Sequence, residues 1–482
     1  MVKRILIVSA LLLFFLPMYA RADMDSAADY VTESQGFPRL SALFDGDTKH
    51  GPKGQNHASI TFRLPEDCRY AYLIFDTEYG PFTVTNAETG EVQTAGTDNF
   101  LHTLVDLQAL FPDRPETVTF HFDNGPVPLL ELTLLEDGPL PSWVQQWLPP
   151  VENGADLVLF STHADDEQLF FAGVLPYYAG QLGYRVQVVY LTNHRNLSED
   201  PNIRCHEALD GLWAVGVRHY PVFGSFGDYY SRREQDAINQ YAQAGVSQDT
   251  LLEFVVSQLR RFRPLVALGH DLNGEYGHGA HCLYADLLTQ ALDAAADGSR
   301  FEASAAQYGP WQTPKLYLHL YEENQITLDW DQPLSAFGGL TAFQVTKQLG
   351  FPAHASQQSG FAWYMSGIDR AADIPKYSPC NYGLWRSTVG PDAEKTDFFE
   401  SLTPYAQQEA LARQEAQEQL AEQLRQEEQA RLEQAGKETQ TEAAGLPMSP
   451  DAPAQPETPW ILVLAPVLLV AVTLALYLRK RP

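Results

Sequence analysis

The sequence predicts an α/β domain with a mostly parallel sheet, preceded by an antiparallel β-sandwich module and followed by a helical stalk and one transmembrane helix. Three observations predict this order. Strand-like apolar runs alternate with amphipathic helical runs over residues 153–400, which is typical of a parallel sheet covered by helices. Short alternating runs separated by turn residues fill residues 23–140. A charged helical run and then a long apolar run follow the α/β part.

Residues 1–22 have the pattern of a secretory signal peptide. Lys3 and Arg4 precede an apolar run at 5–15, and the small residues Ala20 and Ala22 provide a cleavage site after Ala22. A retained membrane anchor is the alternative interpretation. We therefore expect export of the chain. The formal net charge of −29 argues against nucleic-acid binding, which requires basic patches.

Residues 23–140 carry the predicted β-sandwich, with strands expected at 58–62, 70–75, 117–122 and 129–135. The segment L-F-D-G-D from Leu43 loosely resembles the galactose-binding-like sandwiches appended to carbohydrate enzymes. A structural module and a glycan-binding module both stay open. The linker at 141–152 holds Trp143 and Trp147 between prolines, which predicts a short helix packed against a domain.

Residues 153–400 alternate between strands and helices, as in a Rossmann-like sheet. The first predicted strand ends at His163, and the other predicted strands cover 185–191, 220–223, 264–269 and 316–321. Predicted helices cover 168–180, 204–215 and 248–262, and residues 376–390 are expected to form an aromatic loop. The four cysteines lack Cys-x-x-Cys spacing, so we expect buried thiols, with disulfides as the alternative.

Polar residues crowd the end of the first strand of this domain. The buried run at 157–160 is followed by His163, Asp165, Asp166 and Glu167. In open α/β sheets, ligands bind beyond the carboxyl ends of parallel strands. Carboxylates and an imidazole this close together are costly to bury unless a positive charge lies among them. A divalent metal ion is the expected partner.

A second polar stretch follows the predicted strand at 264–269. His278 and His281 lie three residues apart at the start of an amphipathic helical run, so both imidazoles share one face of its first turn. His163, Asp166 and His281, with water in the fourth position, have the composition of a catalytic zinc site. Ligand types overlap between metals, so iron or another divalent ion stays open.

The stretches T-H-A-D-D-E (162–167) and H-D-L-N-G-E-Y-G-H-G-A-H (270–281) resemble two motifs of the PIG-L/LmbE-like zinc-dependent N-acetylglucosaminyl deacetylases. In that family, the first motif is usually A-H-P-D-D-E, and the second motif ends in H-P-D-H. Residues 204–217 resemble its Arg-x-x-Glu helix ending in Gly-Val. The resemblance covers about half the chain, from near Gly154 to near Glu400.

This resemblance implies a role for each matched residue. The zinc ligands would be His163, Asp166 and His281; Asp165 would be the general base; His278 would be the general acid or the electrostatic partner of the tetrahedral intermediate. Tyr276 would help to polarise the scissile carbonyl, and Arg204 would reach the substrate. We also expect Asn193, Asp228 and Asp271, all in strand-end or rim positions, to contact substrate.

Two positions depart from the family pattern. Ala164 replaces the proline of the first motif, which removes a conformational restraint but no ligand. Gly279 and Ala280 replace Pro-Asp between the histidines of the second motif, so the carboxylate that could orient His278 is missing there. Asp271 or Glu275 is the expected substitute.

The C-terminal part predicts a membrane anchor on a stalk. Residues 401–436 read as a charged, solvated helical stalk ending at Gly436, with a weak coiled coil as the alternative. Residues 437–459 form a Pro-rich spacer. The apolar run at 460–478 is near the ~20 residues that span a bilayer. The basic residues of the tail at 479–482 predict a cytoplasmic C-terminus and an extracytoplasmic catalytic domain.

Together these patterns predict a membrane-anchored, extracytoplasmic zinc hydrolase. The family resemblance implies that it removes acetyl from an N-acetylhexosamine (GlcNAc-type) of a glycan or glycoconjugate. One alternative is a catalytically inactive, glycan-binding surface protein, which the missing aspartate of the second motif favours. Another is a zinc amidase or esterase that acts on a different substrate. The sequence does not predict an oligomeric state.

Overall fold

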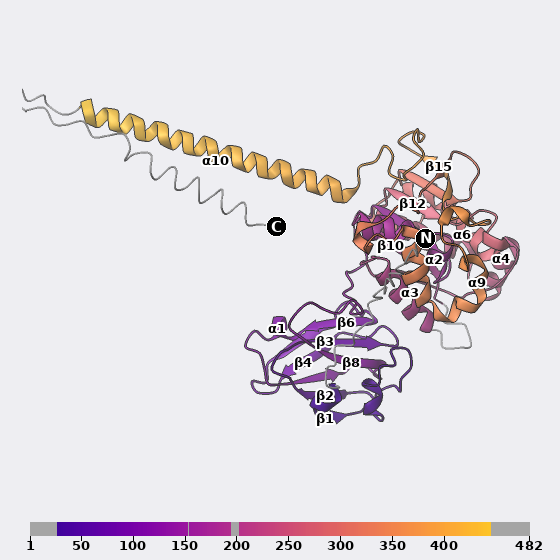
Figure 1. Ribbon diagram of the computed structural model, residues 1–482, viewed down its shortest axis with the longest axis horizontal. Coiled ribbons are helices and arrows are strands. Elements are labelled where there is room, and N and C mark those ends of the chain that lie inside the picture. Colours follow the sequence, from indigo (N-terminus) through magenta and orange to yellow (C-terminus); the bar gives the residue numbers. More distant parts are fainter. Residues whose placement is uncertain (1–26, 153, 194–201, 445–482) are drawn as a thin grey trace, which may run out of the picture. The chain divides into compact units, whose positions relative to one another are not determined.

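The computed structural model describes residues 27–152, 154–193 and 202–444 of the chain (Figure 1). It contains one compact unit that ends at Ala410 and a second that begins at Leu411. The predicted signal peptide at 1–22, the spacer from 445 on, the apolar run at 460–478 and the tail at 479–482 lie outside the described residues. Within the described part, none of the helices combines the length and the apolar character needed to cross a bilayer.

The N-terminal module is an antiparallel β-sandwich, as predicted. One sheet has the order β1 (Val31–Gln35), β2 (Ala58–Arg63), β7 (Thr117–Phe122), β4 (Phe82–Asn86) and β5 (Val92–Ala95). The other has the order β6 (His102–Asp106), β3 (Cys68–Phe75) and β8 (Leu129–Glu136). Large aromatic residues, including Phe62, Phe75 and Phe120, fill the space between the sheets and are fully buried. The sequence analysis located β2, β3, β7 and β8 but not the other four strands.

The α/β domain has one seven-stranded sheet. Its order is β11 (Val222–Phe226), β10 (Val186–Thr192), β9 (Leu157–Ser161), β12 (Val266–Gly269), β13 (Lys315–His319), β15 (Asn381–Ser387) and β14 (Gln325–Thr327). The first five strands are parallel, and the last two are antiparallel to their neighbours. Strand β9 is the middle one of the five parallel strands, so the residues that follow it reach the centre of their carboxyl edge.

Helices cover both faces of this sheet. Along β9, Leu157 and Leu159 belong to one core cluster and Val158 and Phe160 to the other, because successive side chains point to opposite faces. The first cluster includes side chains of α2 (Asp166–Leu169) and α3 (Ile203–Ala214), and the second includes side chains of α4 (Glu234–Gln243), α5 (Gln248–Phe262) and α6 (Gly279–Ala296). The remaining described α-helices are α1 (Leu107–Leu110), α7 (Glu302–Tyr308), α8 (Ala342–Val345), α9 (Gln358–Met365) and α10 (Tyr405–Ala444).

Several predicted elements differ from the structure. Residues 376–390, expected to be a loop, contain β15, which lacks the alternating burial pattern of a half-exposed strand. Residues 139–150 form turns and a bridge in place of the expected short helix, although Trp147 packs against Trp213 and Tyr220 as expected. Helix α10, the long helix of Figure 1, continues through Gly436 to Ala444, because a single glycine costs a helix only about 1 kcal/mol. All four cysteines are buried thiols.

The helix predicted at 168–180 is interrupted. Helix α2 ends at Leu169, and a separate helical turn covers Pro176–Gln181. Between them Gly173 adopts φ +94°, and a Cβ at this position would lie 2.4 Å from Cγ of Trp330. Close packing against a tryptophan more than 150 residues away in the chain therefore breaks a helix that the local sequence favours.

We expect Gly173→Ala to lower the free energy of unfolding by about 2–4 kcal/mol, because it adds backbone strain and an overlap with Trp330. Urea unfolding measures the loss. Gly183→Ala is the matched control, because Gly183 also has a positive φ, +66°, but its Cβ would meet no atom within 4 Å. Equal losses in the two variants would show that the contact with Trp330 contributes nothing.

Candidate active site

A cavity of about 140 Å³ opens beyond the carboxyl ends of β9, β11 and β12. Seven residues that the sequence analysis selected line it: His163, Asp165, Asp166, Arg204, Asp228, Tyr276 and His278. Three further lining residues, Tyr230, Gln357 and Phe361, were not predicted. His281 is fully buried and contacts the floor of the cavity through His163 and Asp166. The two predicted motifs therefore meet at one site.

The three predicted metal ligands form a nearly equilateral triangle of donor atoms. His163 Nδ1 lies 3.0 Å from Asp166 Oδ2 and 3.1 Å from His281 Nε2, and His281 Nε2 lies 3.2 Å from Asp166 Oδ2. With bonds of about 2.0–2.1 Å, donors around a tetrahedral zinc ion lie roughly 3.3 Å apart. Burial raises the pKa of Asp166, but the charges and hydrogen bonds of His281 and His163 have a larger, opposite effect. Together they hold this pKa well below its usual value. The residues present therefore fit a zinc ion.

Two other groups of donors lie nearby and fit a metal less well. In the group of Asp166, His270 and His281, the Nε2 atom of His270 accepts the Thr162 N–H at 3.0 Å, and its Nδ1 atom contacts Glu275 at 2.8 Å. Both nitrogens of His270 are therefore engaged. In the group of His163, His278 and His281, the Nδ1 atom of His278 already accepts the Ala280 N–H at 3.2 Å.

Asp165 lies beside the triangle in a strained conformation. Its φ is 145°, a value that residues other than glycine rarely adopt. Its Oδ1 atom lies 3.0 Å from Nη2 of Arg204, which also donates to the Ala164 carbonyl at 2.5 Å. Burial raises the pKa of Asp165 to about 7, although the charge of Arg204 acts in the opposite direction. A carboxylate with this pKa can take up and release a proton near neutral pH.

His278 is oriented by the backbone and not by a carboxylate. It is the N-cap of α6, and its Nδ1 atom accepts the Ala280 N–H at 3.2 Å. The expectation that Asp271 or Glu275 orients this ring is wrong: Asp271 accepts from Asn273, and Glu275 contacts three other histidines. Burial and the neighbouring His163 and His281 lower the pKa of His278 far below its usual value. The neutral ring therefore carries its proton on Nε2.

The walls of the cavity are aromatic. Tyr276 has a φ of 47° and lies between His278 and Phe361, with ring centroids 5.6 and 6.1 Å away. Tyr230 packs edge-on against His278 at 5.1 Å and is 57% exposed, so one face of its ring is open to a ligand. Such rings provide flat apolar surfaces beside the polar floor.

A turn from outside both motifs supplies part of this wall. His354 Nε2 lies 2.8 Å from Oε1 of Glu167, and Ser356 donates its N–H and its hydroxyl to Glu207 at 2.8 and 2.6 Å. These contacts hold the turn that carries Gln357, from which α9 continues to Phe361. Glu167 and Glu207 belong to motifs that the sequence analysis recognised, but nothing in the sequence indicated that they bind His354 and Ser356.

Two predicted substrate contacts are not brought to the cavity. Asp271 bonds within its own turn, to the backbone and side chain of Asn273. Asn193 precedes the gap at 194–201 in the described residues, and its backbone N–H donates to Phe226. Neither residue lines the cavity as it is defined by the described residues. Asp228, in contrast, lines it and lies 3.2 Å from Nε2 of His163.

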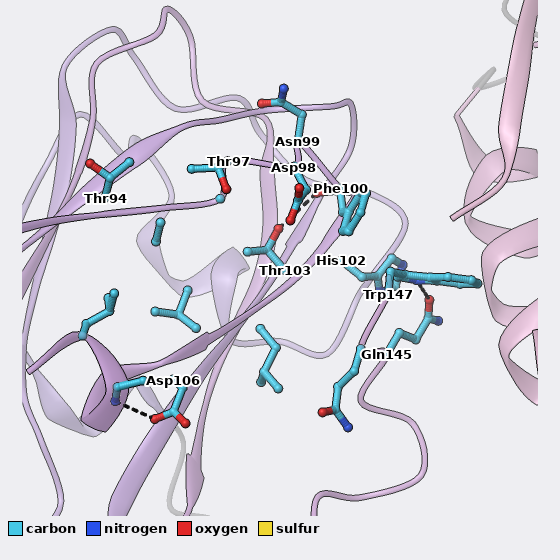
Figure 2. Close-up of a pocket in the computed structure, with 17 residues that line it drawn as sticks. Thr94, Thr97, Asp98, Asn99, Phe100, His102, Thr103, Asp106, Gln145 and Trp147 are labelled. Carbon is cyan, nitrogen blue, oxygen red and sulfur yellow. Dashed lines mark hydrogen bonds between the residues drawn. The ribbon is translucent and has the colours of Figure 1, made fainter. Parts of the chain in front are cut away.

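A larger cavity, of about 400 Å³, lies in the β-sandwich (Figure 2). It is lined by the loop between β5 and β6, by β6 and α1, and by residues 145–147 of the linker. Trp147 Nε1 donates to Gln145 at 2.8 Å, and Asp106 accepts two amide N–H groups as the N-cap of α1. Asp98 and Asn99 are exposed at its rim.

Residues 158–292 match the family model PIG-L, described as GlcNAc-PI de-N-acetylase. This match confirms the resemblance of the two motifs: the core of the α/β domain is a segment of the PIG-L type. It includes the motif after β9, the helix that carries Arg204, and His278 and His281 of the second motif.

Curated relatives carry de-N-acetylase names. The 1D-myo-inositol 2-acetamido-2-deoxy-alpha-D-glucopyranoside deacetylase of Rhodococcus erythropolis is 27% identical over 190 residues, 35% of this chain and 62% of the relative. A deacetylase of the same name, numbered 1, from Frankia casuarinae is 25% identical over 299 residues, 51% of this chain and 94% of the relative. The chain therefore spans about 62% of the length of the Rhodococcus relative.

Among solved structures, N,N'-diacetylchitobiose deacetylase from Pyrococcus horikoshii is 13% identical. The match covers 48% of this chain and 83% of that one, with a TM-score of 0.31.

Proposed function

We propose that this protein is a metal-dependent N-deacetylase that removes the acetyl group from an N-acetylhexosamine (GlcNAc-type) moiety of a glycan or glycoconjugate. The observation that carries the proposal is the triangle of donors from His163, Asp166 and His281, with the Asp165 carboxylate beside it. Zinc held by these three residues would supply Lewis-acid activation of water and of the amide carbonyl.

The protein's own groups then have distinct tasks. Asp165 accepts a proton from the attacking water, and Arg204 holds its carboxylate in place. The Nε2–H of His278 and the hydroxyl of Tyr276 face the developing oxyanion. Because the Ala280 amide occupies Nδ1 of His278, we assign this ring electrostatic stabilisation, not the general-acid role. Asp165, with a pKa raised to about 7, passes its proton on to the leaving amine.

The sequence outside the described residues is the basis for a proposal on where in the cell this reaction occurs. We propose that the signal peptide and the apolar run at 460–478 display the domain outside the membrane, with the tail at 479–482 in the cytoplasm. The substrate would then be an N-acetylated carbohydrate accessible at the cell surface.

Acetate release tests the proposal. The full chain, loaded with zinc, is incubated with GlcNAc-inositol, N,N'-diacetylchitobiose and free N-acetylglucosamine, and acetate is measured with an enzyme-coupled assay. We expect release from at least one sugar, and none from the His281→Ala variant. Turnover of simple esters or peptides, without any from N-acetyl sugars, would point to the amidase or esterase alternative and overturn the substrate class.

The pH dependence of the reaction tests the role of Arg204. Its positive charge lowers the pKa of Asp165, so replacing it with glutamine raises that pKa. The acidic limb of kcat/KM, where the rate falls about tenfold per pH unit, therefore moves to higher pH. Arg233→Gln is the control, because Arg233 is exposed and pairs with Asp236. An acidic limb at the same pH in Arg204→Gln would contradict this coupling.

The cavity of Figure 2 favours a second candidate function, glycan binding by the sandwich. The side chains of Asp98 and Asn99 are exposed there, and their oxygen atoms can accept hydrogen bonds from sugar hydroxyls. Titration of the full chain with a panel of glycans, beside an Asp98→Ala variant, tests it. If the chain binds no zinc and releases no acetate but captures a glycan through Asp98, the binding function replaces the catalytic one.

A further inference from the structure

One fully buried carboxylate, that of Glu275, contacts three histidines. Its Oε2 atom lies 2.8 Å from Nδ1 of His270 and 2.7 Å from Nδ1 of His281. Its Oε1 atom lies 2.6 Å from Nδ1 of His319 and accepts the Asp271 N–H at 3.3 Å. Glu275 and all three rings are buried, with side-chain exposures of 0%. A buried carboxylate is retained only with such partners.

Each ring has a second contact that defines its orientation. His270 accepts the Thr162 N–H through Nε2, so its proton lies on Nδ1 and is donated to Glu275. His319 Nε2 lies 3.0 Å from the Ser378 carbonyl, so contacts at both of its nitrogens fix the orientation of the ring. His281 gives its Nδ1 proton to Glu275, and its Nε2 lone pair then points to Asp166 and His163.

The backbone around Glu275 allows it to point inward. Gly274 has a φ of +66° and Tyr276 a φ of 47°, so the chain turns sharply on both sides. Glu275 thus reaches the three histidines below the cavity, while Tyr276 lines the cavity itself. The same turn therefore supplies one residue to the cavity wall and one to the buried histidines beneath it.

We infer that Glu275 is the positioning residue of the metal site, which fixes the tautomer and the direction of His281 without touching the substrate. The inference rests on the proposed metal-dependent function. A carboxylate that accepts the second ring proton of a metal-binding histidine makes the ring a better ligand and holds its orientation. Here the same carboxylate also contacts His270, which follows β12, and His319, the last residue of β13, so it links the direction of His281 to the carboxyl edge of the sheet.

The test compares zinc affinity in the full chain before and after Glu275→Gln. The amide keeps the size of the side chain, but it offers one acceptor oxygen and places an NH₂ group against a ring N–H. We expect the zinc Kd, measured in competition with a fluorescent chelator, to rise about 10- to 100-fold. Circular dichroism of the metal-free variant should keep the parent spectrum.

Asp271→Asn is the matched control, because Asp271 lies in the same turn, is 9% exposed and contacts no histidine through its side chain in the described contacts. Its zinc Kd should stay within about twofold of the parent value. If Glu275→Gln does not fold, Glu275→Asp, which keeps the charge but is too short for all three rings, is held to the same expected loss.

A Glu275 variant that folds and binds zinc as tightly as the parent overturns the positioning role. The proposed function fails in a different way, because then the parent chain itself binds no zinc. The two outcomes are therefore distinguishable by the affinity of the parent.

Discussion

Replacing Asp165 with asparagine is expected to lower kcat for acetate release by about 10²- to 10⁴-fold, the usual contribution of a general acid–base group. Asparagine keeps the size of the side chain and a contact with Arg204, but it cannot take up the water proton. Because Asp165 is not a corner of the donor triangle, the variant should still bind about one zinc ion per chain. Steady-state kinetics and metal analysis of the same preparation measure both effects.

Asp271→Asn provides the control for this prediction, because it removes a buried carboxylate close to the site that does not line the cavity. Its kcat should remain near the parent value. An Asp165→Asn protein with full zinc and full turnover would eliminate Asp165 as the base. Loss of zinc together with turnover would instead indicate that Asp165 helps to bind the metal.

Replacing His281 with alanine is expected to remove both the zinc and the activity. The side chain is fully buried and supplies one of the three donor atoms, which lie 3.0–3.2 Å from one another, so its removal leaves only two of the proposed ligands. The loss also frees one partner of the Glu275 carboxylate. Zinc content should fall from about one per chain to near zero.

His57→Ala is the control, because this ring is 75% exposed in the sandwich and should leave zinc content unchanged. Thermal unfolding with and without added zinc gives a second measurement. The parent should gain stability from the metal, and the His281→Ala variant should gain none. A variant that retains one tightly bound zinc would refute the assignment of His281 as a ligand.

The local sequence predicted the centre of the site well. The run at 157–160 is apolar at every position, as in a strand buried on both faces, and the polar cluster behind it lies where strand β9 ends. His278 and His281 lie at the start of α6, within one turn of each other, as their spacing predicted. These assignments depend on contacts between residues close in sequence, so a single sequence carries them.

The surroundings of the site could not be predicted in this way. Nothing near Phe361 or Gln357 indicates that a turn anchored on Glu167 and Glu207 brings them to the cavity wall. His319 lies inside the predicted strand at 316–321 and had no predicted role, although it contacts Glu275 at 2.6 Å. Glu275 was weighed as a partner of His278, but only the folded turn shows which rings its oxygens reach.

What the sequence by itself determined is that a β-sandwich precedes the α/β domain, together with the central strands and the residues of the two motifs, since hydrophobic periodicity and short-range spacing are local properties of the chain. The tertiary structure decided where the helix at 168–180 breaks and that β15 joins the sheet. It also decided that the Ala280 amide orients His278 and that the Glu275 carboxylate orients His281. The reason is physical: a glycine against Trp330, a strand paired with β13 and a carboxylate that reaches His319 are each specified by a partner far away in the sequence. Their energies exist only once the elements have packed together.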